Sequence, residues 1–244
     1  MEEKKTQVKI CGLTRQEEVK WILEENADYF GIVLFFPKSR RNNSIENAGK
    51  LLGVCRTECE KRRREDKNFT APVSVAVTVS PTPEQVKEIE ETGFDMIQIH
   101  GKLTKETLDT VSIPVIRAFS TAEMDACHQY DGCPKVAAYL FDAQSPGSGT
   151  TFDWNLIPDF WKNKRSDGGA VDGTTDGSTY CSEKKIFLAG GLNGKNVREA
   201  IAHVHPDVAD VSSGVEKDDI MADGTVMKDR EKIKEFIRKV RADE

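Results

Sequence analysis

The sequence has no uninterrupted apolar run that approaches the roughly 18 residues of a membrane-spanning helix. It has no excess of basic residues either, because 35 Lys and Arg stand against 41 Asp and Glu, a formal net charge of -6. Affinity for the nucleic-acid backbone usually needs such an excess, so nucleic acid is not an expected partner. The N-terminal segment, Met1 to Lys5, lacks the apolar core of a signal peptide. We therefore expect a soluble cytoplasmic protein that contacts no membrane.

Cysteines are too scattered along the chain to form a disulfide framework. The six are Cys11, Cys55, Cys59, Cys127, Cys133 and Cys181. Cys55 and Cys59 lie one helical turn apart, but no His and no second Cys pair completes a zinc pattern. With 244 residues, the chain can bury a sizeable core without such supports. We expect no metal and a reducing cytoplasmic setting.

Strand-like and helix-like segments alternate eight times. Strands are expected at residues 7–11, 29–34, 73–79, 96–100, 115–119, 138–142, 185–189 and 208–211. Helices are expected at residues 16–25, 44–55, 83–92, 103–110, 122–129, 154–164, 196–203 and 229–240. Repeated strand–helix units imply a parallel sheet covered by helices. Eight of them in this length favour an α/β fold with one domain, a single (β/α)8 TIM barrel over residues 1–244.

Two polar segments interrupt this alternation. Residues 56–67 are nearly all charged, with signs that almost cancel, so we expect a solvated extension of the second helix or a loop beneath the barrel. Residues 165–184 are rich in Gly, Asp, Ser and Thr, which is typical of a polar surface loop. Because this second segment lies between a helix and the next strand, we place it on the face opposite the active site.

Active sites of (β/α)8 barrels lie at the carboxyl ends of the strands. Here these ends carry polar or ionisable residues, among them Cys11, Arg41, His100, Asp142 and Asp210. The loops after two of the strands carry small residues that can present backbone N–H groups to an anion. They are Gly190 and Gly191 after the seventh strand, and Ser212, Ser213 and Gly214 after the eighth. Either loop alone could be only a tight turn, but together they favour a phosphate site.

Cys11 and Asp142 are candidates for a proton-transfer pair. The alternative for Cys11 is a buried packing residue, and for Asp142 a turn cap. Lys9 alternates with Cys11 along the first strand, and a cationic cleft can lower the pKa of a thiol. A thiolate and a carboxylic acid across a barrel mouth could then act as general base and general acid.

Six motifs, in order, resemble the phosphoribosylanthranilate isomerase family across nearly the whole chain. They are VKICGLT, GIVLFFPKSRR, IQIHG, LFDAQSPGSGTTFDW, LAGGLNGKNV and ADVSSGVE. The resemblance implies a monomeric or homodimeric (β/α)8 barrel with no cofactor and no metal. It also implies an enzyme of tryptophan biosynthesis that binds a small phosphorylated substrate. Its reaction would be the Amadori rearrangement of N-(5-phosphoribosyl)anthranilate to 1-(o-carboxyphenylamino)-1-deoxyribulose 5-phosphate.

The resemblance also implies roles for individual residues. Cys11 matches the general base and Asp142 the general acid, while Arg41 matches the residue that holds the anthranilate carboxylate. Asp210 is expected near the bridging nitrogen of the substrate, and His100 is either a pocket donor or a structural residue. The chain departs from the family at residues 77–79, where Val-Thr-Val stands in place of the more usual Phe-Val-Asn. Substrate contacts near the third strand are therefore expected to differ.

The sequence leaves two other functional interpretations open. One is another phosphosugar barrel, such as an aminoaldose isomerase of histidine biosynthesis. Such enzymes typically rely on two aspartates, so Cys11 at the end of the first strand distinguishes this chain from them. The other is a non-catalytic barrel kept as a binding protein, which the retained Cys11, Asp142 and Arg41 argue against.

Overall fold

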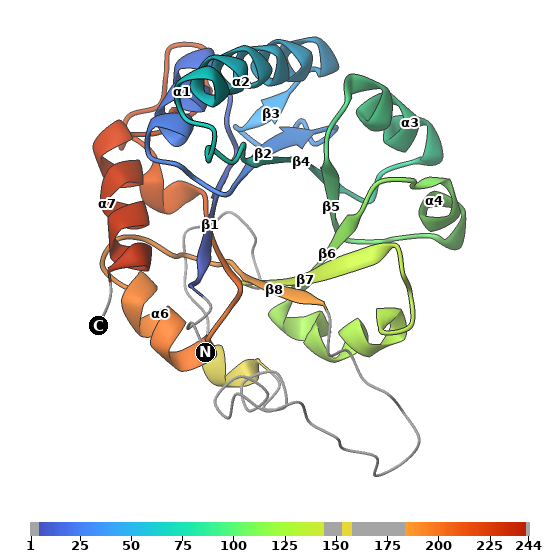
Figure 1. Ribbon diagram of the computed structural model, residues 1–244. Helices are drawn as coiled ribbons and strands as arrows, with labels where there is room; N and C mark the ends of the chain where they lie inside the picture. The colour runs from blue at the N-terminus through green and yellow to red at the C-terminus, as the bar shows by residue number, and fades with distance from the viewer. Residues whose placement is uncertain (1–4, 144–152, 158–183, 243–244) are drawn as a thin grey trace.

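The computed structural model describes residues 5–143, 153–157 and 184–242. Its centre is a closed barrel of eight parallel strands, seen along its axis in Figure 1. The barrel strands are β1 (Gln7–Cys11), β2 (Tyr29–Leu34), β4 (Val73–Val79), β5 (Met96–His100), β6 (Val115–Ser120), β7 (Val136–Asp142), β8 (Lys185–Leu188) and β9 (Val208–Val211). The pairing of β1 with both β2 and β9 closes the ring. The predicted TIM barrel is confirmed.

Helices surround the barrel, and most follow the strand that the sequence predicts (Figure 1). The α-helices are α1 (Gln16–Glu24), α2 (Ile45–Glu65), α3 (Pro83–Thr92), α4 (Lys105–Thr110), α6 (Val197–Val204) and α7 (Arg230–Arg241). Three short elements are 3-10 helices: η1 (Thr121–Tyr130), η2 (Trp154–Leu156) and η3 (Ser213–Val215). A two-residue strand, β3 (Asn42–Asn43), extends the pairing of β2.

Local sequence signals set several helix ends. Ser44 caps α2 by accepting the backbone N–H of Asn47 at 3.1 Å. Thr82 and Gln85 form a capping box at the start of α3, where Pro83 occupies the first turn. The charged segment 56–67 mostly continues α2, so the first of its two predicted alternatives is correct. The predicted helix at 122–129 is a 3-10 helix instead.

Alternation along the strands divides the core into two parts. One set of side chains packs inside the barrel, and it includes Tyr29, Val75, Ile116, Leu140 and Phe187. The opposite set packs between the strands and the helices. Tyr29 and Phe187 meet edge to face with ring centroids 5.2 Å apart, and they fill the barrel beneath its polar mouth. The barrel is therefore a packed core, and its cavity lies at the carboxyl ends of the strands.

Two predictions fall largely outside the described residues. Of the polar segment 165–184, the structure describes only Lys184, and of the helix expected at 154–164 it describes only residues 154–157. Within the described ranges, no helix is long and apolar enough to cross a membrane.

Candidate active site

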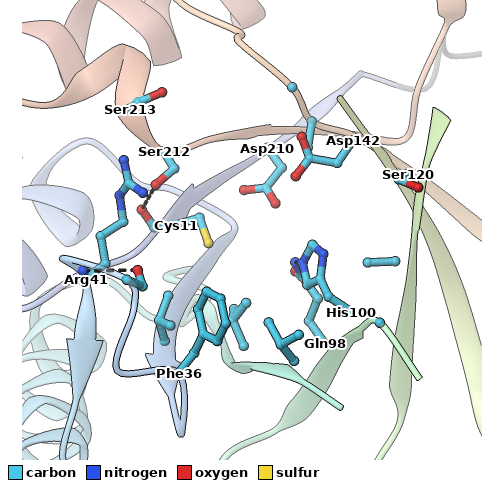
Figure 2. Close-up of a pocket in the computed structure, with 18 of the residues that line it drawn as sticks. Cys11, Phe36, Arg41, Gln98, His100, Ser120, Asp142, Asp210, Ser212 and Ser213 are labelled. Carbon is cyan, nitrogen blue, oxygen red and sulfur yellow. Dashed lines mark hydrogen bonds between the residues drawn. The ribbon is translucent and has the colours of Figure 1, made fainter. Parts of the chain in front are cut away.

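The predicted site residues come together around one cavity of about 340 Å³ at the barrel mouth. All of them line this cavity except Gly214. Figure 2 shows Cys11, Asp210 and Asp142 facing it. These residues lie on β1, β9 and β7, and the order of the strands in the ring is β1, β9, β8, β7. A volume near 340 Å³ suits a small-molecule ligand.

Cys11 ends β1, and its sulfur points into the cavity (Figure 2). Gly31 on the neighbouring strand makes room for it, because a Cβ there would lie 2.8 Å from the Cys11 Sγ. Burial raises the pKa of Cys11 above its usual value of 9.0, and Asp210 raises it further. Lys9 and Lys228 oppose this rise with their positive charges. The sequence suggested a lowered thiol pKa, and the structure reverses that direction because burial outweighs the nearby cations.

Lys9 and Asp210 form a buried ion pair beside Cys11. They are register partners on β1 and β9, and Lys9 Nζ donates to Asp210 Oδ2 at 2.8 Å. The Lys9 side chain is 0% exposed and that of Asp210 is 5% exposed. Among the described residues, the second carboxylate oxygen, Asp210 Oδ1, is buried without a hydrogen-bond partner. An orphaned acceptor at the wall of a cavity is suited to a donor on the ligand.

Asp142 ends β7 and is 8% exposed. Its Oδ1 accepts the backbone N–H of Ala143 at 2.8 Å. Burial raises the pKa of Asp142 to about 6, although the Ala143 N–H opposes the rise. Asp210 raises this pKa further, whereas Lys9 lowers it. A carboxyl group with this pKa can be protonated near neutral pH, as a general acid must be.

Arg41 reaches the cavity from the segment after β2, across Gly12. Gly12 has φ +81, and a Cβ at this position would lie 2.5 Å from Arg41 Cδ. The guanidinium is already paired with a carboxylate, because Nε and Nη2 donate to Glu216 Oε1 and Oε2 at 2.5 and 2.9 Å. Only the Nη1–Nη2 edge therefore remains for a ligand. Sequence reasoning missed Glu216 as a site residue, although it ends the ADVSSGVE motif.

His100 and Gln98 form a polar pair on β5, with 2.7 Å between Gln98 Nε2 and His100 Nε2. Burial, with the charges of Lys9 and Arg117, lowers the pKa of His100 to about 3. The imidazole is therefore neutral at physiological pH. Gln98 also lines the cavity, and the sequence signal for it is its spacing of two from His100, which puts both on the inner face.

The two glycine- and serine-containing loops lie side by side at the cavity. Gly190 and Gly191 have φ of +87 and +64, a backbone conformation that side chains disfavour. Gly214 stands behind them, because a Cβ there would collide with the carbonyl oxygen of Leu192. It therefore permits the close approach of the loops without lining the cavity. Ser212 Oγ is engaged, since it donates to the Cys11 carbonyl oxygen at 3.0 Å (Figure 2).

Apolar side chains complete one wall of the cavity. They include Phe36, Val33, Val77, Val79 and Ala118. Val77 and Val79 are the positions at which the sequence departs from the resembled family. At both positions the chain has a valine, whose aliphatic side chain lines the cavity. This wall suits an apolar, planar part of a ligand.

Comparison with known proteins agrees with this arrangement. The model of a family described as N-(5'phosphoribosyl)anthranilate (PRA) isomerase matches residues 8–239. Over 239 residues the chain is 38% identical to N-(5'-phosphoribosyl)anthranilate isomerase from Streptococcus gordonii, which covers 97% of this chain and 98% of that protein. The chain belongs to the phosphoribosylanthranilate isomerase family. It is an aldose–ketose isomerase of tryptophan biosynthesis, which converts phosphoribosylanthranilate to 1-(o-carboxyphenylamino)-1-deoxyribulose 5-phosphate.

Solved structures of the family share the fold. The phosphoribosylanthranilate isomerase of Thermotoga maritima is 28% identical, with a TM-score of 0.71 over 97% of this chain and 98% of that one. A second structure, 28% identical with a TM-score of 0.68 over the same shares, is of a family member in complex with reduced 1-(o-carboxyphenylamino)-1-deoxyribulose 5-phosphate. Family membership removes the alternatives of a histidine-pathway isomerase and a non-catalytic barrel.

Proposed function

We propose that this chain carries out the Amadori rearrangement with Asp142 as general acid and Cys11 as general base. The observation that carries this assignment is the shared cavity. A thiol and a carboxyl group with a raised pKa face it from β1 and β7, and the Lys9–Asp210 pair lies beside the thiol. Cys11 is the only cysteine that lines this cavity among the described residues. Burial raises the pKa of Asp210 too, but Lys9 pairs with its carboxylate, which favours Asp142 as the proton donor.

Asp142 would act first. Its proton passes to the ring oxygen of the ribose as the bond between that oxygen and C1′ breaks. The lone pair of the anthranilate nitrogen forms the C1′=N bond, so the product of this step is a protonated Schiff base. The pKa of about 6 leaves a protonated fraction of Asp142 near neutral pH, which suits this role.

Cys11 would then remove the proton from C2′. The electrons of the C–H bond form a C1′=C2′ double bond, and those of the C=N bond return to nitrogen, which gives an enolamine. Protonation at C1′ and loss of the C2′ hydroxyl proton complete the ketose. Burial raises the pKa of Cys11, so the thiolate needs positive charge nearby. Lys9 supplies one such charge, and the protonated Schiff base supplies another once it forms.

Asp210 would accept a hydrogen bond from the bridging nitrogen. Its Oδ1 is buried without a partner among the described residues, whereas Lys9 holds Oδ2. This acceptor would stabilise the positive charge that develops on nitrogen as the ring opens. Asp210 thus helps the first step, although its negative charge raises the pKa of Cys11.

The remaining contacts would hold the two anionic ends of the substrate. Backbone N–H groups around Gly190, Gly191 and Ser213 suit the phosphate. The Nη1–Nη2 edge of Arg41 suits the anthranilate carboxylate, because Glu216 occupies the other edge. Val77 and Phe36 would pack against the aromatic ring.

Every proposed site residue comes from one chain, so a monomer is sufficient for the chemistry. The relative from Thermotoga maritima has been described as dimeric, and a homodimer of this chain is equally compatible with the site. We place the enzyme in the cytoplasm, whose reducing conditions keep a catalytic thiol active.

A turnover assay tests the assignment directly. Loss of the fluorescence of phosphoribosylanthranilate reports the reaction, and the wild-type chain should show it. Cys11→Ala and Asp142→Asn should each lower kcat by about 10² to 10⁴, the usual contribution of a general acid or base. Cys133→Ala is the matched control, because this thiol lies away from the cavity. A folded Cys11→Ala variant that keeps more than about a tenth of wild-type kcat would make Cys11 a packing residue.

A further inference from the structure

A cluster of buried charges lies directly behind the cavity wall. Lys228 is 0% exposed and does not line the cavity. Its Nζ donates to Glu216 Oε1 at 2.8 Å, to the Ser212 carbonyl oxygen at 3.1 Å and to Ser212 Oγ at 3.3 Å. Burial lowers the pKa of Lys228, and the Glu216 carboxylate opposes this fall. Three acceptors around Nζ match the three hydrogens of an ammonium group, so the contacts favour the charged lysine.

Glu216 joins this ammonium to Arg41. Its Oε1 accepts from both Lys228 Nζ and Arg41 Nε, and its Oε2 accepts from Arg41 Nη2. Despite burial, these contacts lower the pKa of Glu216, so the carboxylate is ionised. Figure 2 shows the Arg41 guanidinium beside Ser212, which Lys228 also holds. One buried lysine therefore fixes residues at both anion-binding parts of the cavity.

A second carboxylate anchors the backbone of Lys228. Glu18 is 0% exposed, and its Oε1 accepts the Lys228 backbone N–H at 2.6 Å. Its Oε2 accepts the backbone N–H groups of Thr14 and Arg15, at 2.6 and 3.0 Å. These two residues belong to the loop that follows Cys11. The position of Lys228 is thus tied to the loop that leaves the catalytic strand.

The net charge of this cluster indicates a role beyond packing. Arg41 and Glu216 form a neutral pair, and the Lys228 ammonium adds one positive charge at Ser212, which lines the cavity. The Glu18 carboxylate contacts the Lys228 backbone N–H and not its ammonium. The substrate has a carboxylate and a phosphate, so a neutral wall would attract it poorly. Buried ion pairs are also weak sources of stability, because desolvation offsets their attraction. A stabilising role alone therefore accounts poorly for the buried charges of Glu216 and Lys228 next to the cavity.

We propose that Lys228 and Glu216 are positioning residues for the substrate, which orient the free edge of Arg41 and the Ser212 loop and keep that wall positively charged. This inference rests on the proposed function. Neither residue touches the reacting atoms. Loss of Lys228 should therefore weaken binding of the ground state and of the transition state alike, which raises KM more than it lowers kcat.

The test compares Lys228→Met with Lys232→Met. Lys232 is a matched control on α7, because its Nζ donates to the Glu216 backbone carbonyl and to Asp218, not to the Glu216 carboxylate. We expect Lys228→Met to raise KM by at least about tenfold with kcat within about threefold, and Lys232→Met to stay near wild type. If Lys228→Met does not fold, Lys228→Gln should give the same split, since it removes the charge and keeps a donor. A KM equal to that of the control would overturn the proposal.

A double-mutant comparison identifies the route of the effect. If Lys228 acts largely through Arg41, adding Lys228→Met to Arg41→Ala should raise KM by much less than it does in the wild-type background. Equal fold-changes in both backgrounds would refute an action through Arg41.

Alkylation of Cys11 can be measured without turnover, so it tests this proposal independently of the assigned reaction. The charged groups that face Cys11 are Lys9 on its own strand, Asp210 on β9, Arg41 and Lys228. Removing the Lys228 charge should move the midpoint of Cys11 alkylation to higher pH by about half a unit or more. If wild type alkylates normally but does not turn over phosphoribosylanthranilate, the reaction is misassigned and this shift still tests the cluster. An unchanged midpoint, like that of Lys232→Met, would count against Lys228 in either case.

Discussion

The pH dependence of kcat/KM should reveal an unusual order of titration in the acid–base pair. The active form needs Cys11 as thiolate and Asp142 as carboxylic acid. Burial puts the pKa of Asp142 at about 6 and raises that of Cys11 above its usual 9.0, so the acid titrates below the base. In that order the active form is a minor species, and its fraction is constant between the two pKa values. We therefore expect kcat/KM to rise up to about pH 6, to stay flat, and to fall only in the alkaline range.

This order is the reverse of the one expected from the residues alone, in which the thiol gives the rising limb and the acid the falling limb. Below the pKa of Asp142, kcat/KM should fall about tenfold per pH unit, which corresponds to about 1.4 kcal/mol per unit. The structural reason is that one desolvated cavity shifts both groups upward. Only the pKa of the carboxyl group moves toward neutral pH, because the pKa of the thiol already lies above it.

The assay measures initial rates between about pH 5 and pH 9 in wild type and Asp142→Asn. The substrate phosphate also titrates near pH 6, so wild type alone cannot assign the limb. Asp142→Asn keeps the phosphate contribution but should lose the plateau, because the thiolate fraction alone then sets the rate and kcat/KM keeps rising toward the pKa of Cys11. Alkylation of Cys11, with Cys133→Ala to remove a competing thiol, gives the second pKa independently. A thiol midpoint below pH 7, or a plateau from about pH 6 that persists in Asp142→Asn, would refute the reasoning.

Three further outcomes follow from the same geometry. Arg41→Ala should raise KM more than it lowers kcat, because the substrate carboxylate persists through the reaction; steady-state kinetics would contradict this with an unchanged KM and a collapsed kcat. Gly31→Ala should lower kcat by at least about tenfold, since the added Cβ would lie 2.8 Å from the Cys11 Sγ. Gly53→Ala, with nothing within 4 Å, is the matched control and should keep full activity. Asp142→Asn should be more stable than wild type at pH 8 by up to roughly 3 kcal/mol. Folding raises the pKa of Asp142 from 3.8 to about 6, so wild type loses stability as the pH rises through this range, whereas the asparagine variant does not. Urea unfolding at pH 8 and at pH 4 checks this, and an equal difference at both values would contradict it.

The sequence predicted the barrel and most of the site because both depend on local patterns. Apolar runs define the strands, and parallel strands bring their carboxyl ends to one face, so Cys11, Asp142 and Asp210 had to meet there. Glu216 and Lys228 carry no such signal. Their contacts with Arg41 and Ser212 depend on loops whose course no periodicity describes.

The direction of the thiol pKa was also beyond sequence reasoning. Lys9 beside Cys11 suggested a lowered pKa, but the outcome depends on how deeply the strand end is buried. Asp210 adds to the difficulty, because it pairs with Lys9 and removes part of the positive charge that the thiol would otherwise experience. Such competition between desolvation and charge is a property of the folded cavity.

Because Asp142 and Cys11 are buried in the same cavity, no change in its burial favours the active forms of both. Deeper burial would raise the pKa of Asp142 further and so protonate it more fully, but it would also disfavour the thiolate of Cys11. A positive charge close to the thiol escapes this conflict when it lies nearer to Cys11 than to Asp142. Lys228 meets that condition, since its charge lowers the pKa of Cys11 and its Nζ contacts Ser212 Oγ, which donates to the Cys11 carbonyl oxygen. The protonated Schiff base adds a second such charge only after Asp142 has delivered its proton. Formation of the thiolate is therefore favoured most at the stage of the reaction that requires a base.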